Sequence, residues 1–178
     1  MNQQKLQSFA CDILQGLDYT HSCGVIHSDM KIQNALLQRP EKEEAEAGEY
    51  PIVKICDFGL SHLMSADYGG KALMVERCGT GGYIAPEIGS KNSLIGPEID
   101  MWAFGVMLYE MCTAYKPTKL FNYRYGKPQT KFNQSHIGSG PIPFRERDWR
   151  KHNKYIKDLI MECLETDPLK RIQSQEAL

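Results

Sequence analysis

No stretch of this sequence is apolar for long enough to cross a bilayer. The longest mostly apolar segment, 99–109, has about half the residues that a membrane-spanning helix needs. Residues 1–5 are polar, unlike the start of a secretory signal peptide. The formal net charge of −1 gives no overall attraction to nucleic acid or to a membrane surface. We therefore expect no membrane span and no nucleic-acid partner, and a location in the cytoplasm, with the nucleus not excluded.

Paired cysteines are also missing. The chain has six cysteines, which form no CxxC pair and no cysteine–histidine cluster with the spacing of a zinc site. They are Cys11, Cys23, Cys56, Cys78, Cys112 and Cys163. We interpret them as reduced thiols of an intracellular protein.

What is present is the composition of a soluble globular domain, with 42% apolar and 24% charged residues. The length of 178 residues suffices for one domain with its own core. Apolar residues recur at helical spacing over 3–22 and over 155–164, which predicts two amphipathic helices. Residues 99–112 are apolar nearly all round, as is typical of a buried helix. A further helix is expected to begin at 174–178.

The remaining segments are shorter or lack a period. Residues 36–37 and 51–56 are predicted to form two short strands. Between them, the acidic segment 41–49 has no apolar periodicity and is expected to be a solvated loop. Residues 61–75 have no clear period and are expected to form a mobile loop. Residues 113–144, rich in Gly, Pro, Tyr and Lys, predict a loop with one short helix.

The stretch 27–34, His-Ser-Asp-Met-Lys-Ile-Gln-Asn, carries the most chemistry. It has an aspartate, a lysine two residues later and an asparagine five residues after the aspartate. The aspartate can orient an attacking hydroxyl and accept its proton, the lysine can offset charge on a moving phosphoryl group, and the asparagine can hold a metal ion by its carbonyl oxygen. Residues 57–59, Asp-Phe-Gly, and 79–87, Gly-Thr-Gly-Gly-Tyr-Ile-Ala-Pro-Glu, follow in that order.

These ordered motifs resemble the C-terminal lobe of a eukaryotic protein kinase. The resemblance covers nearly the whole chain and implies a mainly α fold, the kinase large lobe, with short β-hairpins carrying the catalytic and Asp-Phe-Gly loops. Residues 1–178 would then be one partial kinase domain, with a catalytic loop at 27–34 and an activation segment at 57–87. A lysine two residues after the aspartate is the Ser/Thr kinase pattern, and residues 78–87 are similar to the calcium/calmodulin-dependent group.

The resemblance implies four catalytic positions. Asp29 would be the base, Lys31 would lie near the transferred phosphate, Asn34 would support the metal, and Thr80 would hydrogen-bond to Asp29. The other interpretation of Asp29 is an aspartate that caps a turn. The flanking Lys31 and Asn34 make that the lesser one.

ATP and Mg²⁺ are the implied cofactors, and protein substrates and ATP are the implied partners. Asn34 and Asp57 would hold magnesium through oxygen ligands, with Lys31 beside the phosphates. Leu36 would lie beneath the adenine ring. Taken alone, Asp57 would also suit a turn at the end of a strand. Cys56 has two interpretations, a thiol that faces the nucleotide pocket and a buried inert thiol.

Other matches imply supporting contacts. Glu87 is expected to pair with Arg171, a contact that matters for stability rather than chemistry. Asp100 is expected to brace the backbone around His27. His27 is expected to be a packed core residue next to Phe58 rather than a proton carrier.

Two positions depart from the family pattern. Ser28 stands where most kinases carry an arginine that binds a phosphorylated residue of the activation segment. Glu76, four residues before Thr80, stands where a phosphorylatable threonine is common. We therefore expect a kinase that is not switched by phosphorylation within 61–80.

The resemblance does not include an N-terminal lobe. The sequence has no Gly-rich loop, strand lysine or helix glutamate ahead of residue 27. Phosphoryl transfer depends on positioning, so full activity is expected only with an N-terminal lobe, from a missing upstream segment or from another chain. An end at Leu178, inside an expected helix, favours an incomplete gene model.

The hypothesis is a Ser/Thr protein kinase that transfers the ATP γ-phosphoryl group to a protein hydroxyl. The alternative is an inactive kinase-like binding module, a pseudokinase, but the presence of Asp29, Lys31, Asn34 and Asp57 favours a catalytic origin. A third alternative is single-strand nucleic-acid binding by a basic aromatic loop, which the overall charge does not support. That loop contains Lys116, Lys119, Tyr123, Arg124, Tyr125, Lys127, Lys131 and Phe132.

Overall fold

The computed structural model describes residues 2–39, 50–89, 91–117, 142 and 144–178. The expected acidic loop at 41–49 and most of the expected loop at 113–144 lie outside these residues. Within the described ranges, no helix is both long and apolar enough to cross a membrane.

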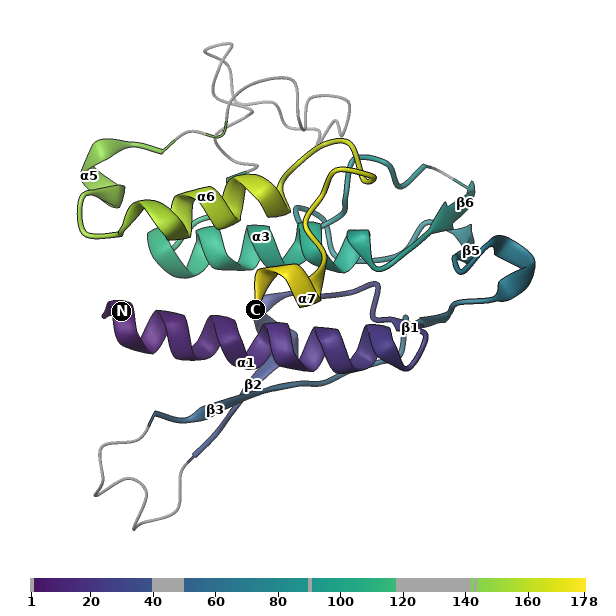
Figure 1. The fold of residues 1–178 in the computed structure, drawn as a ribbon, viewed down its shortest axis with the longest axis horizontal. Coiled ribbons are helices and arrows are strands. Elements are labelled where there is room, and N and C mark those ends of the chain that lie inside the picture. Colours follow the sequence, from purple (N-terminus) through teal and green to yellow (C-terminus); the bar gives the residue numbers. More distant parts are fainter. Residues whose placement is uncertain (1, 40–49, 90, 118–141, 143) are drawn as a thin grey trace.

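The described residues are rich in helix and poor in sheet (Figure 1). The helices are α1 (Gln3–Ser22), α3 (Glu98–Thr113), α5 (Glu146–Trp149), α6 (Lys154–Cys163) and α7 (Ser174–Ala177). The strands and 3₁₀ turns are β1 (Val25–Ile26), η1 (Ile32–Asn34), β2 (Ala35–Gln38), β3 (Ile52–Ile55), β4 (His62–Leu63), η2 (Ala66–Tyr68), β5 (Ala72–Glu76) and β6 (Lys91–Ile95). The helices predicted from periodicity are confirmed. The short α5 was not predicted.

Helix α1 forms where the sequence predicts it because its apolar residues share one face. Leu6, Ile13 and Leu17 on that face are at most 1% exposed. The Asn2 side chain caps the helix by accepting a hydrogen bond from the backbone N–H of Lys5 at 2.8 Å. Gly24 follows the helix with a φ of 74°, which turns the chain toward β1.

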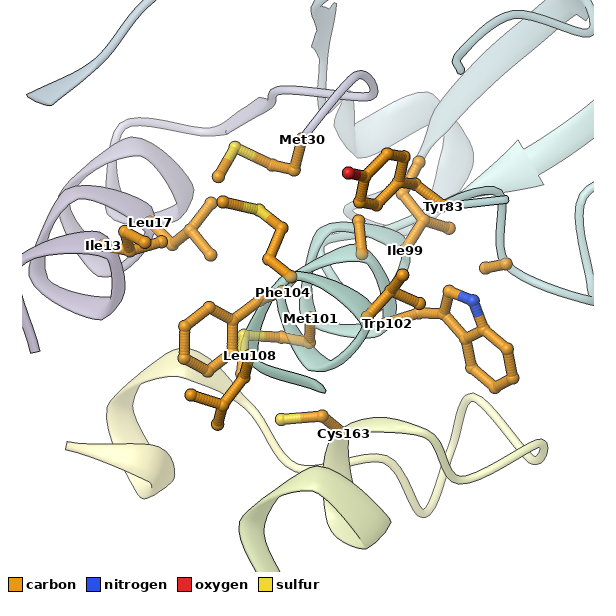
Figure 2. Close-up of a cluster of buried hydrophobic side chains, with 14 of the residues drawn as sticks. Ile13, Leu17, Met30, Tyr83, Ile99, Met101, Trp102, Phe104, Leu108 and Cys163 are labelled. Carbon is orange, nitrogen blue, oxygen red and sulfur yellow. The ribbon is translucent and has the colours of Figure 1, made fainter. Parts of the chain in front are cut away.

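Helix α3 is the centre of the core and lies between α1 and α6 (Figure 1). Its residues 98–109 are all buried, which explains the absence of a polar face in the sequence. Figure 2 shows Leu17 of α1 and Cys163 of α6 reaching toward α3 from different sides. At Gly105 a Cβ atom would lie 2.6 Å from the Cβ of Cys163, so only glycine permits this approach of α3 and α6.

In the part of the chain that the structure describes, three antiparallel two-stranded sheets flank the helices, pairing β1 with β4, β2 with β3, and β5 with β6. The β2–β3 hairpin matches the two predicted strands. Residues 27–34 lie between β1 and β2, and Asp57 follows β3, so short strands bring residues 27–34 and 57–59 together.

The expectation of a loop over 61–75 is wrong in part. This segment contains β4, η2 and the start of β5. Strand β5 pairs with β6, and one face of the pair is buried. The buried residues on this face are Ala72, Met74 and Ile95. The pairing escaped sequence analysis because the partner strand is distant in the chain and was not predicted.

Candidate active site

The backbone of the 27–34 loop is fixed by one buried carboxylate from α3. Asp100 is 1% exposed and accepts hydrogen bonds from the backbone N–H groups of His27 at 2.8 Å and Ser28 at 2.9 Å. The Nε2 atom of His21, at the end of α1, lies 3.0 Å from the same carboxylate. The expected brace at Asp100 is therefore confirmed, and it joins α1, α3 and the loop.

His27 is a packed residue, as expected. Its Nδ1 accepts from the backbone N–H of Asp29 at 3.2 Å, which leaves Nε2 to donate to the carbonyl of Cys56 at 3.0 Å. Its ring lies 4.7 Å from that of Phe58, centroid to centroid. Because both ring nitrogens are engaged within the protein, His27 orders the loop and has no free nitrogen for proton transfer.

Three predicted site residues form one hydrogen-bonded group. The Asp29 carboxylate accepts from Thr80 Oγ1 at 2.7 Å and from Lys31 Nζ at 2.5 Å. Lys31 also donates to Thr80 Oγ1 at 3.0 Å. Asn34 joins the group because its Nδ2 donates to the backbone carbonyl of Asp29 at 2.9 Å. We call Asp29, Lys31, Asn34 and Thr80 the Asp29 cluster.

The cluster keeps Asp29 ionised. Burial alone would raise the pKa of Asp29, but hydrogen bonds from Lys31 and Thr80 and the charge of Lys31 outweigh burial and lower the pKa below its usual value. Asp29 is 6% exposed, so this anion is held among fixed donors rather than by bulk water. Such an arrangement can orient a hydroxyl group without first reorganising.

Asn34 and Asp57 lie at the ends of the paired strands β2 and β3. The backbone N–H of Cys56 donates to the carbonyl of Asn34 at 2.9 Å, and Asp57 is the next residue after this hydrogen bond. Asp57 is exposed, and like Ser28 it has a left-handed φ of 66°, unusual for residues other than glycine. Among the described residues, no group of three or more His, Cys, Asp or Glu could by itself hold a metal ion.

Leu36 lies on an uncovered apolar surface. Its side chain is 55% exposed, and those of Phe58 and Leu60 are 44% and 42% exposed. Leu37, the next residue of β2, points to the opposite face of the strand, where it lines a cavity with Phe9 and Val53. We call Leu36, Asp57, Phe58 and Leu60 the nucleotide face, after the role that the sequence analysis expects for Leu36 and Asp57. Cys56, which directly precedes Asp57, is half-buried, and its thiol donates to the carbonyl of Asn34 at 3.4 Å.

The expected Glu87–Arg171 pair is present. Arg171 is 2% exposed, and its guanidinium donates to both carboxylate oxygens of Glu87, at 2.5 and 3.0 Å. It also donates to the carbonyl groups of Glu98 at 2.8 Å and Glu165 at 2.9 Å. The pair thus ties the end of the 57–87 segment to α3 and to the turn after α6, as a structural contact.

Sequence analysis missed the role of Tyr83. Its hydroxyl donates to Glu110 of α3 at 2.6 Å, and Lys116 Nζ lies 3.8 Å from the centre of its ring. Burial and the Glu110 contact both raise the pKa of Tyr83, so the phenol stays neutral. The signal was present in the Tyr-Ile-Ala-Pro-Glu run, but the partner on α3 is known only from the fold. The other residues of the basic aromatic loop, from Lys119 to Phe132, lie outside the described residues.

The chain matches a family model and curated proteins over most of its length. The family model described as "Protein kinase domain" matches residues 1–178. The chain is 35% identical over 164 residues to Serine/threonine-protein kinase zyg-8 of Caenorhabditis elegans, covering 92% of this chain and 19% of that protein. It is 32% identical over 166 residues to human calcium/calmodulin-dependent protein kinase type IV, covering 93% and 31%. The same identity and length hold for human calcium/calmodulin-dependent protein kinase type 1B, covering 93% and 43%.

The chain therefore spans less than half the length of these curated relatives. The family match extends over every residue of the chain, and the relatives are named as kinases of the Ser/Thr class or of the calcium/calmodulin-dependent group. On these matches, the chain belongs to the protein kinase domain family.

Proposed function

We propose that this chain is the C-terminal-lobe part of a Ser/Thr protein kinase domain, which transfers the γ-phosphoryl group of Mg-ATP to a protein Ser or Thr hydroxyl. The observation that carries the proposal is the Asp29 cluster, in which an ionised Asp29 is held by Lys31 and Thr80. Catalysis of this reaction consists mostly of positioning and electrostatic stabilisation, which such a cluster can supply.

In this proposal the carboxylate of Asp29 accepts a hydrogen bond from the substrate hydroxyl and orients it. Because the pKa of Asp29 is lowered, the carboxylate is a weak base, so it takes the proton only as the new O–P bond forms. The ammonium group of Lys31 donates hydrogen bonds to Asp29 and Thr80. In this position it can offset negative charge next to the incoming hydroxyl. Thr80 fixes the rotamer of Asp29 by donating to Oδ1.

The donor set near Asn34 and Asp57 fits a magnesium nucleotide. Asn34 uses its Nδ2 on Asp29, which leaves its carbonyl oxygen as the atom for a metal, and Asp57 is an exposed carboxylate. Mg²⁺ is commonly bound by one or two protein oxygens together with phosphate oxygens. When bound, Mg-ATP would supply the phosphoryl group and the charge that neutralises it. Leu36 offers an exposed apolar surface of the kind that a purine ring covers.

The nucleotide face also supports the expected need for a second lobe. Leu36, Phe58 and Leu60 of this face are 42–55% exposed, which leaves apolar surface that a second lobe would remove from water. We propose that an N-terminal lobe, from the same polypeptide or another chain, covers this face and completes the nucleotide site. The residues assigned here to catalysis and binding are Asp29, Lys31, Asn34, Leu36, Asp57 and Thr80.

The test is to titrate the isotopically labelled chain with Mg-ATP and follow backbone resonances, then to measure phosphate transfer to a Ser/Thr peptide library. We expect weak binding that shifts signals of 34–36 and 57–59, and slow transfer that is lost in Asp29→Asn. The control Asp158→Asn, on α6, keeps transfer. Binding without transfer would favour the pseudokinase alternative, and neither binding nor transfer, even with an added N-terminal lobe, would contradict the proposal.

A further inference from the structure

The end of helix α1 is linked to the C-terminal helix α7 by side chains that the proposed site does not use. Figure 1 shows α7 lying along α1, and the two helices are in contact. His21, in the last turn of α1, has its Nδ1 atom 3.3 Å from Oγ of Ser174, the first residue of α7. The hydroxyl of Ser174 donates in turn to the Asp18 carboxylate at 3.2 Å. Ser174 is 5% exposed, so few water molecules can compete for these contacts.

The other ring nitrogen of His21 faces the buried carboxylate of Asp100. The Nε2 atom lies 3.0 Å from Oδ2 of that carboxylate, and the His21 side chain is 8% exposed. The same carboxylate accepts from the backbone N–H groups of His27 and Ser28. Through His21 and Asp100, helix α7 is therefore connected to the backbone that directly precedes Asp29.

The number of hydrogen atoms in this network decides which charge on His21 the contacts require. A carboxylate only accepts hydrogen bonds, so Nε2 must carry a hydrogen to bond Asp100. The single hydroxyl hydrogen of Ser174 is directed at Asp18, so the contact between Ser174 and Nδ1 requires a hydrogen on Nδ1 as well. A histidine with a hydrogen on both ring nitrogens is an imidazolium cation. A neutral ring would leave one of these contacts without a hydrogen.

The surroundings of the ring also favour its charged form. Asp100 is 1% exposed, and among the described residues His21 is the only side chain able to carry a positive charge at ion-pair distance from it. A carboxylate at that depth is costly unless a cation pairs with it. His21 also lies at the C-terminal end of α1, where the helix dipole stabilises a cation. Burial of the ring opposes its charge, but Asp100, Asp18 and the dipole all act in the other direction.

We propose that His21 is a positively charged positioning residue, which pairs with Asp100 and links the placement of α7 to the backbone that carries Asp29. Ser174 and Asp18 hold the ring in this charged form. The titratable groups of the network are Asp100 of α3 and Asp18 of α1, because α7 contributes the neutral Ser174 and the loop before Asp29 contributes backbone N–H groups. The bearing on catalysis rests on the proposed function, whereas the charge of the ring does not.

The test is to label the histidine ring nitrogens of the full chain isotopically and to record long-range proton–nitrogen spectra at a pH of about 7.5, where an exposed histidine is mostly neutral. We expect His21 to give the pattern of a ring with a hydrogen on both nitrogens, and His21→Gln assigns its signals by removing them. Burial lowers the pKa of His152, so that ring should give the neutral pattern in the same spectrum. A His21 ring with one bare nitrogen would overturn the proposal.

Variants of α7 test the role of Ser174. Ser174→Ala removes the acceptor of Nδ1, so the ratio of charged to neutral His21, followed across a pH series, should fall at least about fivefold. Ser174→Thr keeps the hydroxyl and should retain the ratio. Gln175→Ala, an exposed change on the same helix, is the matched control and should leave the ratio unchanged. If Ser174→Ala and Gln175→Ala behave alike, the proposed link to α7 is wrong.

Hydrogen exchange of the His27 and Ser28 amides tests the link to the backbone before Asp29. His21→Gln can keep a hydrogen bond to Asp100 but removes the charge, so these amides should exchange about fivefold faster. Ser174→Ala should speed their exchange about twofold, and the control change on α7 should not. Unchanged exchange in His21→Gln, at native helix content by circular dichroism, would overturn the positioning role. These measurements do not involve phosphate transfer, so a failure of the proposed function is detected separately.

Discussion

The Asp29 cluster and the nucleotide face differ in how far their side chains are covered and hydrogen-bonded by the rest of the chain. Asp29 and Asn34 are 6% and 5% exposed, and each has hydrogen-bond partners within the chain. Leu36 and Phe58 are 55% and 44% exposed. The cluster is held by groups from α3 and from the 57–87 segment, whereas the face has nothing over it among the described residues.

This difference separates two parts of the proposed site, one for the substrate hydroxyl and one for the nucleotide. Groups that act on the substrate hydroxyl are organised inside this chain, and their order depends on buried contacts such as Asp100. The groups expected to bind the nucleotide are exposed among the described residues. Changes in the first region should therefore reduce folding stability, while changes in the second should leave stability nearly unchanged and alter binding alone.

Asp100→Ala should have the largest effect on stability. The change leaves the backbone N–H groups of His27 and Ser28 buried without an acceptor, at a cost of about 3–5 kcal/mol in the free energy of unfolding. Chemical denaturation followed by circular dichroism measures the loss. Asp67→Ala, an exposed change in η2, should cost less than about 0.5 kcal/mol. A loss below about 1 kcal/mol for Asp100→Ala would show that the loop does not depend on this carboxylate.

Asp29→Asn should make stability less dependent on pH. Burial would raise the pKa of Asp29, but the hydrogen bonds from Lys31 and Thr80 lower it in the folded chain. Its carboxylate therefore stabilises the folded state above the unfolded pKa, and this contribution is lost as pH falls through the folded pKa. The variant should be less stable than the parent by roughly 1 kcal/mol at pH 7, and the difference should shrink toward pH 3. Thermal unfolding across this range tests it. A difference that stays constant would show that charge is not the cause.

The sequence predicted the helices and the membership of the Asp29 cluster well, for local reasons. Helix α1 repeats its apolar face every turn, and 27–34 carries three cluster residues within one short loop. It failed at contacts that join distant segments. The β5–β6 sheet, the Ser28–His62 bond and the Tyr83–Glu110 bond each pair residues at least 15 positions apart, as with Glu76 and Lys91, and no periodicity encodes them. The exposure of Leu36 was equally hidden, because an apolar strand residue is usually covered.

Leu36→Ser tests the nucleotide face, where a substitution should leave folding stability nearly unchanged. Because the side chain is already 55% exposed, the free energy of unfolding should change by less than about 0.5 kcal/mol. Leu17→Ala, at 0% exposure, should cost about 3 kcal/mol in the same experiment. The shifts that Mg-ATP produces at 57–59 should be weaker in Leu36→Ser than in the parent. Equal stability losses for the two leucines would contradict the distinction between core and face.

Cys78 offers the smallest and most local test of the Asp29 charge. Burial raises the pKa of this thiol, and the Asp29 carboxylate raises it further. Asp29→Asn removes only the second cause, so alkylation of Cys78 by iodoacetamide at pH 8 should quicken about twofold, because the reactive thiolate becomes more populated. Cys23, which is exposed, should react at the same rate in both proteins, and Asp67→Asn should change neither. If Cys78 quickened equally in Asp67→Asn, net charge would be responsible. An increase in the rate at Cys78 alone would instead show that the charge of the Asp29 carboxylate acts on the Cys78 thiol.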